Sequence, residues 1–350
     1  MAPRFVWNLA ASIGFPLGGA AAAAALLSAV ILPRIQLGDV ERIRQLARHV
    51  TGEPLSGSTV IFLGNSITME GLDTSQLGVG QPDWQAENYA ITGCGLSEYR
   101  IILPKLLKRN PVCVVLAFDP MTLQGAADIP ADKAFAYAMA GFVEDWPASW
   151  TADDFPGLDR ATYDILRSNY MRQLLHFRTA PLIWINYRSR AAVRGDLRTD
   201  SSYEWRAPYT MLESVDQGRT QFQLRALAER YRQASPIPSA GGVDLLRRTC
   251  ILVRDSGARL VFVMTPVHPD VRTVASPLLE GTRQTLREMS AEYGGVLLEA
   301  DGVLESSEFA DSVHPNEAGR RIYSELIGRQ VFQTLESTVE SPPPPAAVSR

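Results

Sequence analysis

One serine and one histidine–aspartate pair stand out among the residues of this chain that could do chemistry. Ser66 follows the apolar run at residues 60–63, and Asp311 precedes His314 by three residues, just before a helical pattern. A serine hydroxyl becomes a good nucleophile only when a base takes its proton, and a histidine base needs a carboxylate to fix its tautomer. The spacing therefore suggests a triad with Ser66 as nucleophile, His314 as base and Asp311 as the orienting group.

Each of the two segments also has a simpler interpretation. Ser66 could be a turn or helix N-cap residue, and Asp311 or Asn316 could cap the helix that follows. The functional interpretation of the two segments is strengthened because apolar strands alternate with helical patterns between them, which is typical of a parallel sheet. Ligands of such sheets bind at the carboxyl ends of the strands. Ser66 falls at one such end, and the loop of His314 can reach it.

The composition is that of an ordinary globular protein, and it argues against several functional classes. The chain has 350 residues, 46% of them hydrophobic and 21% charged, with a net charge of -4. That charge, without any block rich in Lys and Arg, argues against a nucleic-acid partner. The four histidines have no metal-ligand spacing and the three cysteines form no disulfide framework. We therefore expect neither a metal nor another cofactor.

The N-terminal segment predicts a membrane anchor. Residues 5–33 carry no charge, and residues 20–32 are almost wholly apolar. Such a stretch reaches the about 20 residues that a helix needs to cross a bilayer. A cleaved signal peptide is the alternative, since small residues lie near Ser28 and Ala29. The apolar run continues past these residues, which favours an uncleaved anchor.

Apolar strands alternate with helical patterns through much of the chain. The expected strands are residues 59–64, 84–91, 112–118, 259–264 and 296–299, and the main helices are 40–50, 97–108, 244–256, 278–293 and 317–332. This alternation predicts a three-layer α/β/α domain with a flavodoxin-like parallel sheet of about five strands in the order 2-1-3-4-5.

The expected domain organisation follows from where this alternation begins and stops. Residues 1–35 are the anchor or signal sequence, residues 36–58 are a linker helix, and residues 59–336 are the catalytic domain. Residues 120–242, with one amphipathic segment at 163–176, form an insertion after the third strand that is expected to fold over the carboxyl edge of the sheet. Residues 337–350 contain four consecutive prolines and are expected to be disordered.

Three short segments resemble signature blocks of the SGNH, or GDSL, hydrolases. Leu-Gly-Asn-Ser-Ile-Thr at 63–68 is similar to the first block, and Asn-Tyr-Ala-Ile-Thr-Gly at 88–93 is similar to the second. Asp-Ser-Val-His-Pro-Asn at 311–316, with Gly319, is similar to the last. The resemblance implies a serine hydrolase without a cofactor. By the same resemblance, Ser66 would attack an acyl ester, and the backbone N–H groups of Ser66 and Gly93 would bind the oxyanion.

The chain departs from the family pattern at two positions. Asn65 stands where most members have Asp, and Asp119-Pro120 follows the third strand where members have Gly-x-Asn-Asp. The side-chain donor that the family's Asn gives to the oxyanion is thus missing. Asp119 is expected either to cap its turn or to bind a substrate hydroxyl. Asn65 is a further candidate substrate contact, and so is His268, whose alternative is a structural hydrogen bond.

The Asp-Pro pattern, the anchor and Thr-Pro-Val-His-Pro at 265–269 resemble a membrane-anchored branch of the family. That branch includes the D-alanine-transfer protein of teichoic acid and the alginate acetylation proteins. The resemblance implies an esterase or acyltransferase acting on an acetyl or other acyl ester of a cell-envelope carbohydrate, outside the cytoplasm, with a membrane acyltransferase as a candidate partner. The arginines after the anchor would instead keep the domain in the cytoplasm by the positive-inside rule.

Two other functions stay open at this stage. A non-catalytic envelope protein that binds a glycan or an assembly partner would explain the missing oxyanion Asn. A lipid esterase held near the bilayer would explain the anchor. Tryptophans 146, 150, 184 and 205 in the insertion suit sugar rings, but they also suit a hydrophobic core.

Overall fold

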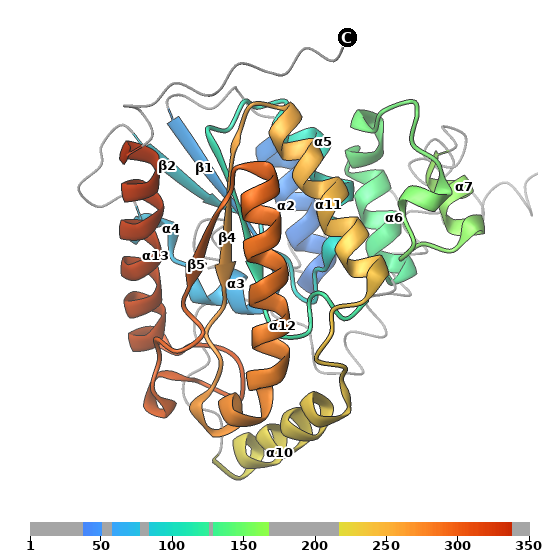
Figure 1. The fold of residues 1–350 in the computed structure, drawn as a ribbon. Coiled ribbons are helices and arrows are strands. Elements are labelled where there is room, and N and C mark those ends of the chain that lie inside the picture. Colours follow the sequence, from blue (N-terminus) through green and yellow to red (C-terminus); the bar gives the residue numbers. More distant parts are fainter. Residues whose placement is uncertain (1–37, 51–57, 78–83, 126–128, 168–216, 338–350) are drawn as a thin grey trace, which may run out of the picture.

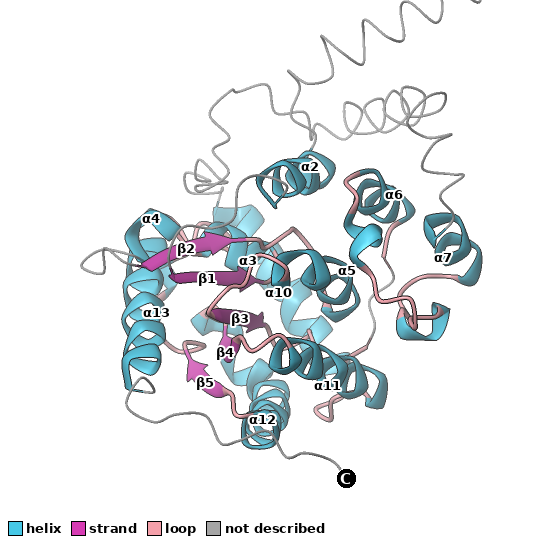
Figure 2. Cartoon of the chain, turned by 90° about the horizontal axis from the view of Figure 1, so that it is seen from above, coloured by secondary structure: helices cyan, strands magenta, loops and turns pink. Residues whose placement is uncertain are grey.

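The computed structural model describes residues 38–50, 58–77, 84–125, 129–167 and 217–337 (Figure 1). At its centre lies a five-stranded sheet in the order β2-β1-β3-β4-β5, in which every neighbouring pair of strands is parallel. Helices cover both faces of the sheet (Figure 2). The predicted three-layer α/β/α fold and its strand order are confirmed.

The strands form where short apolar runs are bounded by turn residues. They are β1 (Ser58–Leu63), β2 (Trp84–Asn88), β3 (Cys113–Phe118), β4 (Arg259–Met264) and β5 (Val296–Glu299). Every residue of the central strand β3 is buried. Strands covered on both faces read as continuous apolar runs, which is why the sequence located β3 and β4 to within one residue.

Alternate side chains of each strand enter two separate hydrophobic layers. Ile61 and Leu63 of β1 pack into one layer, whereas Val60 and Phe62 pack into the other. The first layer is covered by α2 (Gly38–Val50), α5 (Leu96–Leu107), α11 (Ala240–Asp255) and α12 (Pro269–Tyr293). The second is covered by α4 (Thr74–Leu77) and α13 (Glu317–Ser337).

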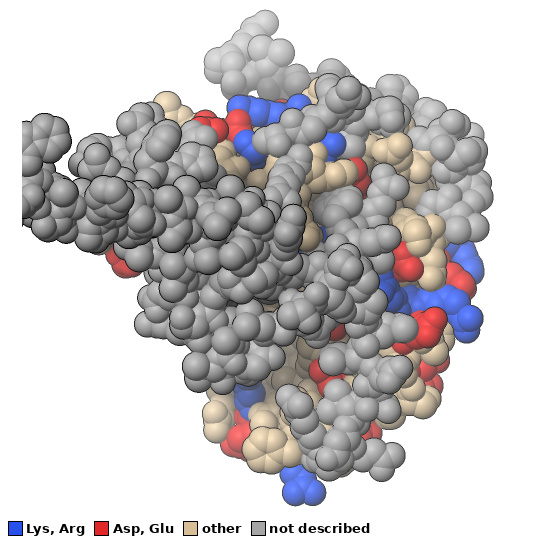
Figure 3. All heavy atoms as spheres, turned by 180° about the vertical axis from the view of Figure 1, so that it is seen from behind, with Lys and Arg blue, Asp and Glu red and all other residues tan. Residues whose placement is uncertain are grey.

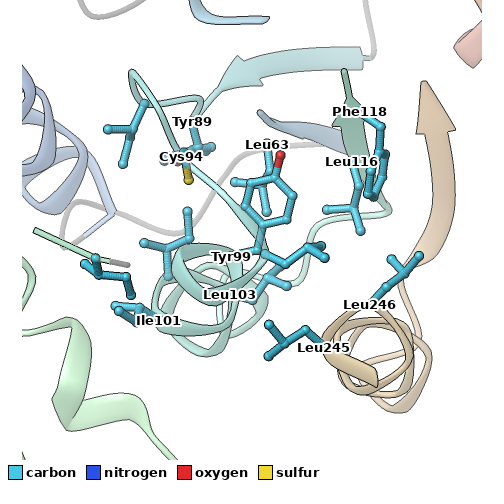
Figure 4. Packing of buried hydrophobic residues seen from close by; sticks show 14 of the residues in the cluster. Leu63, Tyr89, Cys94, Tyr99, Ile101, Leu103, Leu116, Phe118, Leu245 and Leu246 are labelled. Atoms are coloured by element: carbon cyan, nitrogen blue, oxygen red, sulfur yellow. The ribbon is translucent and has the colours of Figure 1, made fainter. Parts of the chain in front are cut away.

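Helix α5 supplies much of the first layer. Figure 4 shows its side chains between the sheet and α11, with Tyr99 reaching toward the strands. The Tyr99 hydroxyl donates to the carbonyl of Ala117 at 3.0 Å, which satisfies a polar group that burial would otherwise penalise. Burial of large apolar side chains here contributes about 1.5–3 kcal/mol each.

Helix α2 is part of the domain core, although the sequence predicts only a linker at residues 36–58. Ile43 and Leu46 are fully buried in the first layer. The buried guanidinium of Arg42 donates to the carbonyls of Asn88, the last residue of β2, and Ala90. These contacts attach α2 to the segment that resembles the family's second block.

The insertion contains α6 (Ala131–Met139), the short helices η3 (Phe142–Asp145) and η4 (Ala152–Asp154), α7 (Arg160–Arg167) and α10 (Gln217–Gln233). In Figure 2, α6 lies beside α2 and α7 lies beyond it, outside the α5 layer. The expectation that the insertion folds over the carboxyl edge of the sheet is therefore wrong for most of residues 131–167, but α6 reaches this edge through Lys133, which binds the carbonyl of Thr92 in the loop after β2. Among the described helices of the insertion, α10 also lies near that edge, where it packs against α12 (Figure 1).

Aromatic packing explains why residues 131–167 form a side layer. The Trp146 ring stacks on Phe155 with centroids 4.2 Å apart, and the Tyr163 ring lies nearly parallel to the Trp146 ring with centroids 6.1 Å apart. The guanidinium of Arg100 on α5 lies over the Trp150 ring at 4.4 Å. Trp146 is thus a core residue. Trp184 and Trp205 lie outside the described residues.

Within the described residues, no helix is long and apolar enough to cross a bilayer. The predicted anchor at residues 1–35, most of the amphipathic segment 163–176 and the proline-rich tail lie outside them. On the face seen in Figure 3, acidic and basic side chains are interspersed over the part of the described surface that is visible.

Candidate active site

Ser66 occupies the sharp turn between β1 and the short helix α3 (Ser66–Gly71). A Cβ atom at Gly64 would lie 2.1 Å from Thr68 Oγ1, so only glycine lets α3 fold back this closely. Asn65 caps the helix, because its Oδ1 accepts the backbone N–H of Ile67 at 3.0 Å. The Gly-Asn-Ser sequence thus places Ser66 as the first residue of α3, at the carboxyl end of β1.

Asn88, at the end of β2, holds the other end of α3. Its Nδ2 donates to the carbonyls of Thr68 and Leu72 at 3.0 and 3.1 Å, and its Oδ1 accepts from the N–H of Ala90 at 3.0 Å. The side chain is completely buried, and each of its polar atoms is paired. Sequence reasoning gave Asn88 no role, although its place in the family-like second block was the available signal.

The loop that carries His314 is organised by Asp311. Oδ1 of Asp311 accepts the backbone N–H groups of Val313 and His314, both at 2.8 Å. The backbone N–H of Ala310 donates to the carbonyl of His314 at 2.8 Å and closes the turn. A spacing of three residues lets one carboxylate bind both the backbone and the ring of the histidine.

The structure brings the three predicted residues together. Oδ2 of Asp311 accepts from Nδ1 of His314 at 2.8 Å, and Nε2 of His314 lies 2.9 Å from Ser66 Oγ. Because the carboxylate holds the ring proton on Nδ1, Nε2 is left to accept the hydroxyl proton of Ser66. Both distances lie within hydrogen-bond range.

Two carboxylates set the acidity of the His314 ring. Burial acts to lower the pKa of His314, but the Asp311 hydrogen bond and the charges of Glu70 and Asp311 hold this pKa above its ordinary value. Burial acts to raise the pKa of Asp311, yet its bonds to His314 and to backbone N–H groups leave this pKa lowered. At neutral pH, Asp311 is therefore ionised.

Glu70 is a site residue that sequence reasoning missed. Its Oε1 lies 4.0 Å from Nε2 of His314, on the side of the ring that faces Ser66. Ser66 and Glu70 are four residues apart on α3, and such residues share one face of a helix. That spacing was the signal in the sequence.

The loop after β2 carries the predicted oxyanion residue. The N–H of Ile91 donates to the carbonyl of Gly64 at 3.1 Å, which keeps this loop beside the end of β1. Gly93 has a φ of 62°, a left-handed conformation that favours glycine. Within the described residues, the N–H groups of Ser66 and Gly93 donate to no protein acceptor. Neither N–H group is therefore used by the fold in the described part of the chain.

The two departures from the family pattern are bonded to each other. Nδ2 of Asn65 donates to Oδ2 of Asp119 at 2.6 Å. Oδ1 of Asp119 accepts the backbone N–H of Met121 at 2.7 Å and the hydroxyl of Thr122 at 3.0 Å. Asp119 therefore caps its own turn and fixes the N-cap residue of α3. These bonds give both candidate substrate contacts a structural role.

His268 lies beside the segment that leads into the loop of His314. Its Nδ1 accepts the backbone N–H of Asp270 at 3.2 Å and so caps α12. Its ring packs against Phe309, with centroids 4.8 Å apart, and Phe309 precedes Asp311 by two residues. Burial lowers the pKa of His268. These contacts fit the structural hydrogen bond that was the alternative to a substrate contact for His268.

Among the described residues, no group of His, Cys, Asp and Glu side chains is arranged to hold a metal ion. Comparison with known protein families finds no match to the chain, and comparison with curated proteins finds no relative. The functional interpretation therefore depends on the site geometry and on the short motifs themselves.

Proposed function

We propose that the protein is a serine esterase or O-acyltransferase that forms an acyl-enzyme on Ser66. The observation that carries this proposal is the unbroken hydrogen-bond line from Ser66 Oγ to His314 at 2.9 Å and on to Asp311 at 2.8 Å. A nucleophile, its base and the group that orients the base must all lie within such reach for acyl transfer.

The proposed first half-reaction makes the acyl-enzyme. As Ser66 Oγ attacks the ester carbonyl, its proton passes to Nε2 of His314, and Asp311 stabilises the charged ring. The N–H groups of Ser66 and Gly93 bind the oxyanion that forms on the carbonyl oxygen. When the tetrahedral intermediate collapses, the ester C–O bond breaks and the leaving alcohol takes the proton from His314.

The second half-reaction releases the acyl group. A water molecule or a sugar hydroxyl gives its proton to His314 as its oxygen attacks the acyl carbonyl. Collapse then breaks the bond to Ser66, whose Oγ recovers the proton. Water as acceptor gives an esterase, and a hydroxyl gives a transferase, so the same residues serve both reactions.

We propose an acetyl or similar acyl ester of a cell-envelope carbohydrate as substrate. Support comes from the motif resemblance to the membrane-anchored branch and from the uncharged segment at residues 5–33. The same features support an extracytoplasmic, anchored domain with a membrane acyltransferase as partner. Trp146 gives no support to a sugar platform, because its ring is stacked in the core.

A second candidate function is a non-catalytic envelope protein that binds a glycan or an assembly partner. The observation that favours it is Asp119, which stands where the family has an oxyanion Asn and is paired with Asn65. Loss of one such donor typically costs an enzyme about 3–4 kcal/mol of transition-state stabilisation. A membrane-proximal lipid esterase remains a third candidate through the same Ser66 chemistry.

A fluorophosphonate probe tests the proposal without assuming a substrate. We expect the wild-type protein to be labelled and Ser66→Ala to be unlabelled. Ser75→Ala, which removes an exposed hydroxyl bound to Asp73, is the matched control and should label like the wild type. Folded wild-type protein that neither labels nor hydrolyses acetyl esters would favour the binding role.

The substrate class needs a separate measurement. Release of acetate from acetylated oligosaccharides, compared with release of fatty acid from lipid vesicles, distinguishes a carbohydrate esterase from a lipid esterase. Addition of an unacetylated oligosaccharide distinguishes transfer from hydrolysis, because a transferase makes an acetylated sugar at the expense of free acetate.

A further inference from the structure

A buried lysine of the insertion lies directly behind the oxyanion loop. Nζ of Lys133, on α6, donates to the backbone carbonyl of Thr92 at 2.5 Å and to Oε1 of Glu98 at 3.2 Å. The residue is only 5% exposed. Lysine is almost never buried unless it is paired, because taking an ammonium out of water is costly. Its place in the fold therefore calls for an explanation.

The carbonyl that Lys133 binds belongs to the same peptide unit as the N–H of Gly93. In a trans peptide the C=O and N–H bonds lie in one plane and point in opposite directions. No cis peptide bond occurs among the described residues. An ammonium on the Thr92 oxygen draws electron density toward that side, which makes the Gly93 N–H a stronger donor. It also fixes the direction of that N–H.

Helix α6 braces the loop through a second residue. Tyr137, one turn after Lys133, donates its hydroxyl to Oε1 of Glu98 at 2.7 Å. The other oxygen of Glu98 accepts the backbone N–H of Gly95 at 3.3 Å, where α5 begins. Burial raises the pKa of Glu98, while Lys133 and Tyr137 act against that rise. The loop is thus clamped on both sides of Gly93.

We infer that Lys133 is a positioning residue of the oxyanion hole, which orients and polarises the Thr92–Gly93 peptide so that Gly93 N–H stabilises the transition state. The inference rests on the proposed esterase function and deepens it. It gives the insertion a role in catalysis. A stronger Gly93 N–H donor offsets part of the oxyanion stabilisation that the family's Asn would supply after β3, where this chain has Asp119.

A pair of esters that differ in one atom tests this role. The substrates are p-nitrophenyl acetate and its thiono analogue, in which sulfur replaces the carbonyl oxygen and accepts hydrogen bonds poorly. We expect Lys133→Met to lower kcat/KM for the oxoester about tenfold or more, mostly in kcat, because full removal of one oxyanion donor costs about 10²–10³. The kcat/KM for the thionoester should fall much less, so the ratio of kcat/KM for the oxoester to kcat/KM for the thionoester should decrease.

Lys105→Met is the matched control. Lys105, on α5, also donates to a carboxylate and a carbonyl of the insertion, Asp145 at 2.8 Å and Gly141 at 3.2 Å, but does not touch the oxyanion loop. We expect it to lower the Tm to a similar extent without changing the ratio. Lys133→Arg, which keeps a cation near Thr92, should restore a large part of the wild-type ratio.

The outcomes separate this inference from the function beneath it. An active wild type together with a Lys133→Met variant that keeps the wild-type ratio overturns the inference alone. Wild-type protein that turns over neither ester and resists fluorophosphonate overturns the proposed function, and the inference with it. If Lys133→Met does not fold, the double variant Lys133→Met/Glu98→Gln removes both buried charges, and the same fall in the ratio is expected.

Discussion

The nucleophile side and the oxyanion side of the site lie at the same edge of the sheet, but different kinds of contact hold them. The turns that carry Ser66 and His314 are capped from within by Asn65 and Asp311, and longer-range bonds from Asn88 to α3 and from Asn65 to Asp119 add to the first of these caps. The Thr92–Gly93 loop is fixed by Lys133, 41 positions further along the chain. The caps form together with their own turns, whereas the bond from Lys133 requires α6 to dock beside the loop.

This difference separates two effects of substitution. Changes on the nucleophile side should remove chemistry while the fold persists, because the affected side chains are few and local. Changes on the oxyanion side and in the insertion should alter rate or stability by smaller factors, because the Gly93 N–H remains present. Substitutions on each side can break or sharpen that contrast.

Ser66→Ala is expected to have the largest effect, with complete loss of ester turnover. The nucleophile is gone, and the small half-buried hydroxyl is replaced without disturbing the N-cap at Asn65. His314→Ala should cost several orders of magnitude, since the serine then lacks its base. Steady-state kinetics with circular dichroism as the folding control measures both. Turnover by Ser66→Ala at the wild-type rate would exclude this triad.

Asp311→Asn should lower kcat by roughly 10⁴, because an amide favours the wrong tautomer of the base. Its remaining oxygen can still accept the backbone N–H groups of Val313 and His314, so the loop should keep its shape. Asp311→Ala removes those bonds as well and should also lower the Tm. Equal Tm values for the two variants would contradict the local role assigned to this carboxylate.

Glu70→Gln should shift the pH dependence of kcat/KM rather than abolish activity. The Glu70 carboxylate, 4.0 Å from the ring, helps to hold the pKa of His314 above its ordinary value. Since the base must be neutral, wild-type activity falls as the pH drops through that raised pKa. Removal of the charge lowers the pKa, so the acid limb should move to lower pH. An acid limb that stays in place or moves up would show that Glu70 does not act on the ring.

Trp146→Ala should have the smallest effect on chemistry per folded molecule and a large effect on stability. Its ring is stacked on Phe155 in the side layer, and truncation of a buried Trp typically costs about 3–5 kcal/mol. Urea unfolding followed by circular dichroism gives the free energy of unfolding, and active-site titration gives turnover per folded molecule. A loss below about 1 kcal/mol would mean that the aromatic cluster is not part of the cooperative core.

Local chemistry of the sequence was enough to predict the sheet and to single out the three side chains that the structure brings within hydrogen-bond reach of one another. The strands are apolar runs, and their alternation with helices leaves little choice of topology. Gly64 and Ser66 mark a tight strand-to-helix turn, and the spacing of Asp311 and His314 lets one carboxylate bind ring and backbone. Each of these signals depends on residues only a few positions apart, so it is visible before the chain folds.

Only the tertiary structure could decide the positions that depend on burial. The sequence predicts this helix only over residues 278–293, and Pro277, which disfavours a helix interior, lies just before that range. The helix instead begins at Pro269, where His268 caps it and where Val271 and Ala275 are buried in the first layer. Packing of these side chains outweighs the local penalty of the proline.

Lys133 and Asn88 illustrate the same limit at the site itself. A lysine in an insertion and an asparagine at a strand end are ordinary in a sequence, and each becomes informative only through its buried partners, Thr92 for one and α3 for the other. The sequence by itself singled out Ser66, His314 and Asp311 and indicated roughly where they lie. Folding decided which buried polar groups support them, because a buried hydrogen bond is set by elements that meet only in three dimensions.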